Sequence, residues 1–272
     1  MRTQPMIKRI GALALAALAA LAGGMVVSFS GTALAAGTPT STATPRPGIA
    51  KSGKTSTIVD VLKQTCEAGI GKRLASLGEL QGKVSASTYL TAGSKATLLG
   101  EIGAENDGLG ALQVKVAGDT DRPTLIADCK SIVEHYRVYL LMIPKAHLMI
   151  ASDAAAAIGQ KLSDLAARLQ AGIEKATGAG KDTSVAQRDL HNLNAAVSAG
   201  TAGAAPVDGL VNFTLPLNPS EYQADEQSVK TARTDIGTAH TNFVQARSDA
   251  KQVAADLNAL RTPRPVTATA TG

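Results

Sequence analysis

Six side chains that could do chemistry lie in one short stretch near the middle of the chain. The stretch includes two of the four histidines and two of the four tyrosines. Cationic and aromatic side chains gathered at a helix junction are typical of a cleft for an anionic or carbohydrate ligand. The candidate ligand-binding residues are His135, Tyr136, Arg137, Tyr139, Lys145 and His147.

The same stretch also has a purely structural interpretation, which we favour. Pro144 lacks a backbone N–H and crowds the preceding turn, so it predicts a kink in a helix that otherwise runs through residues 121–178. A joint of this kind would place Tyr139 in the core and Arg137 and Lys145 at the surface. The apolar residues 139–143 are too few to span a bilayer.

Cys66 and Cys129 are the only cysteines in the chain. Each lies near the start of a predicted helix, and two antiparallel turns would bring those helices side by side and parallel. The spacing therefore predicts a disulfide, which suits a protein that meets oxidising conditions. The alternative is a reactive or metal-binding thiol pair, but no histidine stands at a usual ligand spacing.

Sequence motifs of the common enzyme classes are absent from the chain. It has no HExxH, GxSxG, GxxxxGK[ST] or CxxC pattern. Asp182, Asp189 and His191 could do acid–base chemistry, but they stand in a polar stretch that we expect to be exposed. We therefore expect no catalytic residue, metal or cofactor. An exported hydrolase without a recognisable motif is the remaining enzymatic alternative.

The first 36 residues have the pattern of a secretory signal. Arg2, Lys8 and Arg9 precede an uncharged apolar run, which closes on the small residues of 33–35. We expect cleavage near residue 36, and the alternative is an uncleaved anchor. In both cases the positively charged residues before the apolar run stay on the cytoplasmic side of the membrane. We therefore expect the rest of the chain to be exported to the medium or to the outer face of the cell envelope.

Thr/Pro-rich segments flank the body at 37–55 and 262–272, and both contain TPRP. Their composition predicts extended, solvated tails, and the alternative is a glycosylated spacer. Without the signal, 24 basic residues face 22 acidic ones. This near balance is not the clustered positive charge of a nucleic-acid-binding protein. We expect an envelope or extracellular partner instead.

Apolar residues recur every three or four positions through most of the body, which predicts amphipathic helices. We expect an all-α fold, an elongated bundle of about five helices in two halves, 56–143 and 144–261. The halves would share the long proline-kinked central helix. The predicted helices are 57–86, 92–116, 121–178, 184–199 and 219–260.

Three features interrupt this helical pattern. Glycines stand inside the first two predicted helices, where they indicate either close helix approach or local mobility; those singled out are Gly71, Gly78, Gly82, Gly100, Gly103, Gly108 and Gly110. The small residues of 199–209 predict a flexible loop, and the alternation from Val211 to Leu217 predicts an extended stretch across the bundle. Asn212 to Thr214 fits an N-glycosylation pattern, a match that is common by chance.

The run from Arg137 to Lys145, within an export-signalled helical chain, resembles uncharacterised exported coiled-coil-like proteins of high-GC bacteria. The resemblance covers residues 57–178 and implies an extracellular helical bundle with no catalytic residues. Together with the missing enzyme motifs, it favours a secreted or envelope-associated protein with a non-enzymatic structural or interaction role. The alternative is an extracellular ligand-binding module with a basic, aromatic cleft at the joint near residues 135–147.

Overall fold

The computed structural model describes residues 53–213 and 220–261. The chain divides into two units, 1–50 and 51–272, and all described residues belong to the second. The predicted signal, residues 37–52 and 262–272 of the Thr/Pro-rich segments, and most of the predicted extended stretch fall outside the described residues, whereas residues 53–55 belong to the first described helix.

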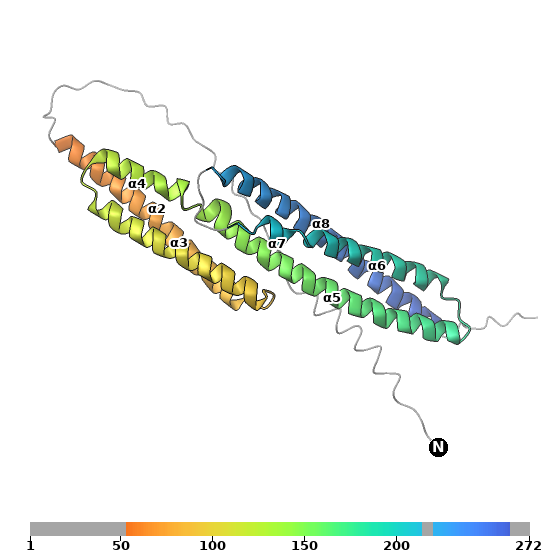
Figure 1. Ribbon diagram of the computed structural model, residues 1–272. Coiled ribbons are helices and arrows are strands. Elements are labelled where there is room, and N and C mark those ends of the chain that lie inside the picture. Colours follow the sequence, from red (N-terminus) through yellow and green to blue (C-terminus); the bar gives the residue numbers. More distant parts are fainter. Residues whose placement is uncertain (1–52, 214–219, 262–272) are drawn as a thin grey trace, which may run out of the picture. The chain divides into compact units, whose positions relative to one another are not determined.

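The described part of the chain is all-α, as predicted, and contains no strand. Two helical halves follow each other along the chain, and three helical segments at 122–178, together called the central helix, lead from the first half into the second (Figure 1). The first half packs α2, α3 and α4 together, and the second packs α5, α6 and α8. The helices are α2 (Gly53–Ala86), α3 (Ala92–Gly118), α4 (Arg122–Glu134), the π-helix η1 (Val138–Met142), α5 (Ile143–Gly178), α6 (Ser184–Ala204), α7 (Val207–Leu210) and α8 (Tyr222–Arg261).

Local capping signals set the starts of two helices where the sequence predicts them. The Thr91 hydroxyl accepts a hydrogen bond from the Ser94 N–H at 3.1 Å and caps α3. The Asp121 carboxylate accepts one from the Thr124 N–H at 3.0 Å and caps α4, where Pro123 stands in the first turn. These short-range bonds satisfy backbone donors that a helix start leaves free.

The predicted Cys66–Cys129 disulfide is present and links α2 to α4. The two Cα atoms lie 5.6 Å apart, within the usual range for a disulfide. Cys66 is buried, so the bridge is part of the core of the first half.

The predicted end of the fourth helix at residue 199 is wrong, since α6 continues to Ala204. Gly200 lies against the ring of Phe243 on α8, where an added Cβ would approach the ring to 2.7 Å. Ala204 is buried at the end of the same helix. Packing against α8 therefore keeps this small-residue segment helical despite its weak intrinsic propensity.

The glycines of α2 and α3 are explained by close approach at one position only. A Cβ added to Gly108 would meet the Tyr136 ring at 2.6 Å. At six of the remaining positions nothing lies within 4 Å of an added Cβ, so helix contact does not require glycine there; they are Gly71, Gly78, Gly82, Gly100, Gly103 and Gly110.

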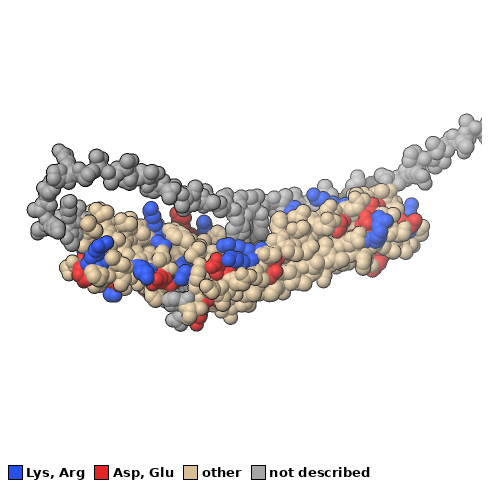
Figure 2. All heavy atoms as spheres, turned by 90° about the horizontal axis from the view of Figure 1, so that it is seen from above, with Lys and Arg blue, Asp and Glu red and all other residues tan. Residues whose placement is uncertain are grey.

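Among the described residues, one run, Arg122–Gly178, is long and apolar enough to cross a membrane by length and composition. Its qualifying window has a mean hydropathy of 1.3, and half of that window is buried inside the fold. A core helix passes the same test, so this is weak evidence for a membrane span. Figure 2 shows positive and negative side chains interspersed on the visible face.

Candidate functional site

The central helix is interrupted between Glu134 and Val138, upstream of the proline. The Ser131 carbonyl accepts hydrogen bonds from the N–H groups of both His135 and Tyr136, which closes α4. The Arg137 carbonyl then accepts from three successive N–H groups, those of residues 140–142, at 2.8 to 3.4 Å. The last of these bonds spans five residues, the spacing of a π-helix, and it begins η1.

Pro144 lies in the first turn of α5, directly after the π-helix. A proline ring crowds the carbonyl four residues earlier and offers no N–H, so it fits poorly inside a regular α-helix. The wider π turn lengthens the repeat just where that conflict would arise. The predicted single helix 121–178 is therefore three helical segments, and the proline marks where the third begins.

Lys145, in the first turn of α5, is almost completely buried, with 2% of its side chain exposed. Its ammonium donates a hydrogen bond to Oε1 of Glu101 on α3 at 2.7 Å. It also donates to the Phe213 carbonyl and lies 5.0 Å from the centre of the Phe213 ring. One side chain thus ties α5 to α3 and to the segment that leads toward α8.

Glu105 stands one turn after Glu101 on α3 and is fully buried. Neither of its carboxyl oxygens has a hydrogen-bond partner among the described residues. Burial, followed by the neighbouring Glu101 charge, raises the pKa of Glu105 to about 7. The Glu105 charge in turn adds to burial in raising the pKa of the Tyr136 phenol.

Arg137 and Tyr139 also have partners within the fold. The Arg137 guanidinium stacks on the Tyr222 ring at the start of α8, 3.4 Å from its centre. The Arg73 guanidinium of α2 lies 5.2 Å from the centre of the Tyr139 ring, and the Tyr139 hydroxyl lies 3.2 Å from the Ser76 hydroxyl. Each contact connects η1 or its approach to a neighbouring helix.

The two histidines of the stretch lie in different surroundings. His135 is the exposed C-cap of α4. His147 is half-buried on α5, and burial, together with the Lys83 charge on α2, lowers its pKa. The charged form of His147 is therefore disfavoured, which does not suit it to bind an anion by charge.

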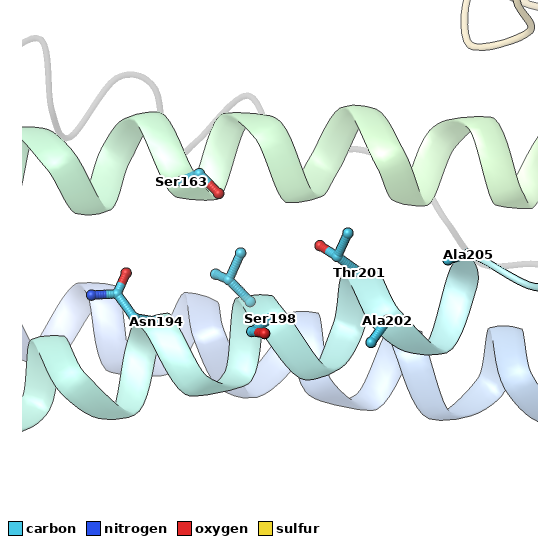
Figure 3. Close-up of a pocket in the computed structure, with 7 residues that line it drawn as sticks. Ser163, Asn194, Ser198, Thr201, Ala202 and Ala205 are labelled. Carbon is cyan, nitrogen blue, oxygen red and sulfur yellow. The ribbon is translucent and has the colours of Figure 1, made fainter.

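A shallow groove of about 430 Å³ runs between α5 and α6, away from the joint. In Figure 3, Ser163 comes from α5, whereas Asn194, Ser198, Thr201, Ala202 and Ala205 come from α6 and its C-terminal end. No residue of the lining is charged or titratable. The groove offers small hydroxyl and amide groups but no group that could act as an acid, a base or a metal ligand.

No protein-family model, curated protein or solved structure matches the chain. Its function is therefore inferred from its own residues. Within residues 53–213 and 220–261, no three His, Cys, Asp or Glu side chains lie close enough together to hold a metal ion.

The structure brings most of the six candidate residues to one joint but gives them different roles. Tyr136, Arg137 and Lys145 face partners inside the fold, whereas Tyr139 is 45% exposed and His135 lies at the surface. The expectation that a simple joint buries Tyr139 and exposes Lys145 is wrong, because the Tyr139 side chain lies at the surface of the π-helix whereas Lys145 pairs with Glu101 inside the fold. Whether the six bind a ligand stays a prediction.

Five residues that meet at the joint were not predicted from the sequence: Glu101, Glu105, Phe213, Tyr222 and Asp225. One of them has a sequence signal. Glu105 falls on the apolar stripe of α3 between Ile102 and Leu109, where a carboxyl group is unexpected. An acidic residue at such a position is itself an indication of a buried carboxyl group.

Proposed function

We propose that this protein is an exported helical protein with a non-enzymatic role, a spacer or an interaction surface. The observation that carries this proposal is the buried contact between Lys145 and Glu101. Because a cation held by a buried carboxylate is not free to receive an anionic ligand, the joint is better suited to hold the halves together than to bind one.

The remaining joint contacts support the same proposal. The Arg137 guanidinium is stacked on Tyr222, and Arg73 lies over Tyr139. The basic and aromatic side chains that would line a ligand cleft thus face one another. Export is supported by the basic, apolar and small-residue pattern of the first 36 residues.

An interaction role is favoured by apolar side chains on the outer face of the first half. Ile126 and Val133 stand seven residues apart on α4, so they share one face, and they are 41% and 53% exposed. On α3, Val114 is 76% exposed. Exposed apolar residues that share a face are a common feature of contact surfaces.

Cell fractionation tests the export part of the proposal. Antibody against the body should detect it in the medium or on the outer envelope, shortened by about 36 residues if the signal is cleaved. Detection of a full-length cytosolic protein would contradict export.

A second experiment tests the interaction surface. Ile126→Glu with Val133→Glu should release the exported protein from any envelope association, whereas Val244→Glu on α8, a site exposed to the same extent as Val133, should not. Equal retention of both variants would argue against this surface. Steady turnover in a panel of hydrolase substrates would contradict the non-enzymatic role.

A further inference from the structure

Two carboxyl groups and one ammonium group are buried together at the joint. Glu101 and Glu105 are four residues apart on α3, so they occupy the same face. Lys145 bonds Oε1 of Glu101, while Oε2 of Glu101 and both oxygens of Glu105 are buried without a partner among the described residues. Lys145 is thus paired with Glu101, and Glu105 is left without a hydrogen-bond partner in the described part of the chain, so Glu105 cannot be ionised without a large desolvation penalty.

The neighbouring helices offer few charged groups that could stabilise an ionised Glu105. The Tyr136 phenol, which precedes η1, is the neighbouring group on the central helix. On α8, Asp225 adds a further carboxyl group near Lys145; burial and Glu221 raise the pKa of Asp225, and Lys145 opposes that shift. On α2, the partly buried Arg73 is directed to Tyr139. Lys145, the cation nearest to Glu101, is engaged by Glu101 and the Phe213 carbonyl.

We propose that Glu101, Glu105 and Lys145 form a pH-responsive clasp, which holds α3 against the joint while Glu105 is protonated and loosens when Glu105 ionises. An ionised Glu105 would be a second buried carboxylate beside Glu101. Water would stabilise the ionised Glu105 carboxylate, and this carboxylate reaches water when α3 moves away from Tyr136. The pH response of the clasp requires neither export nor a binding partner.

The direction of the pH effect follows from the raised pKa of Glu105. In the unfolded chain this carboxyl group titrates near 4.5, and in the folded protein near 7. Its contribution to folding is therefore fully present below about pH 4.5 and is lost as the pH rises through 7. His147 acts in the opposite direction, because its lowered pKa makes acid less favourable for the folded state.

Melting temperatures of the full chain at pH 5 and pH 8 separate these effects. Glu105→Gln keeps the size of the side chain, removes its ionisation and leaves His147 in place. The wild type should lose about 5–10 °C more than Glu105→Gln between the two pH values. Glu79→Gln, at an exposed site on α2, is the matched control and should behave like the wild type.

Amide hydrogen exchange shows which segments loosen at high pH. It therefore distinguishes opening of the clasp from a general loss of stability. After correction for intrinsic rates, residues 101–112 and 138–145 should gain exchange at pH 8 in the wild type and not in Glu105→Gln. The second half of α8 should show no such gain. Equal pH dependence of wild type and Glu105→Gln, or a gain spread evenly over all helices, would overturn the proposal. Glu105→Leu provides a second neutral variant should Gln fold poorly.

Discussion

Lys145 on α5 and Glu101 on α3 form a buried ion pair, with 2.7 Å between Nζ and Oε1. The two residues are 44 positions apart in the sequence, and 2% and 12% of their side chains are exposed. Through the same ammonium, the Phe213 carbonyl is held beside them. The pair thus fixes how the central helix meets the first half and the segment before α8.

The aromatic and arginine residues at the edge of the joint should tolerate truncation. Tyr139→Ala removes an exposed ring and a contact with Arg73, and Arg137→Ala removes the stack on Tyr222. Each change should lower the free energy of unfolding by about 1 kcal/mol, as partly exposed cation–π pairs do. Urea unfolding measures both. A loss of several kcal/mol from Tyr139→Ala would mean that this ring is a core residue after all.

The glycines of the first half should respond oppositely to alanine. Gly71→Ala, Gly78→Ala and Gly82→Ala fill open space on α2 and should each stabilise by up to about 1 kcal/mol. Gly108→Ala forces a methyl group onto the Tyr136 ring and should destabilise by about 1–3 kcal/mol. Thermal unfolding of the four variants compares them directly. Destabilisation by the α2 substitutions would show that these glycines have a further role.

The disulfide should contribute strongly to stability. Closing a loop of 63 residues restricts the unfolded chain by about 4 kcal/mol on loop entropy alone. Intact-mass analysis of the native protein after alkylation should show no free thiol. Cys66→Ser with Cys129→Ser should lower the melting temperature by about 8–16 °C. Two alkylated cysteines in the oxidised, folded protein would exclude the bridge.

Short-range signals predicted most of the fold. The 3.6-residue period located the major helices, and the matched positions of Cys66 and Cys129 indicated the disulfide. Each of these depends on residues near one another or on a simple alternation of helix direction. Such information is present in the local sequence.

The structure of the joint could not be predicted from the local sequence alone, because it depends on how helices distant in the sequence pack. Pro144 correctly signalled an interruption, but at the π-helix before it Tyr139 is exposed, and after it Lys145 is buried. The partner of Lys145 lies on another helix, so its identity depends on how α3 and α5 pack. The continuation of α6 to Ala204 likewise depends on Phe243, which packs against Gly200 from α8.

A double-mutant cycle between Lys145 and Glu101 tests most directly whether the joint holds the structure together. Lys145→Met and Glu101→Leu each leave one buried charge without its partner, so each should cost about 3–5 kcal/mol in the free energy of unfolding. The double variant removes both charges and should be much more stable than the sum of the two losses predicts, by at least about 2 kcal/mol. Additive single losses within about 0.5 kcal/mol, or a Lys145→Met variant as stable as the wild type, would contradict the claim that this ion pair holds the joint together.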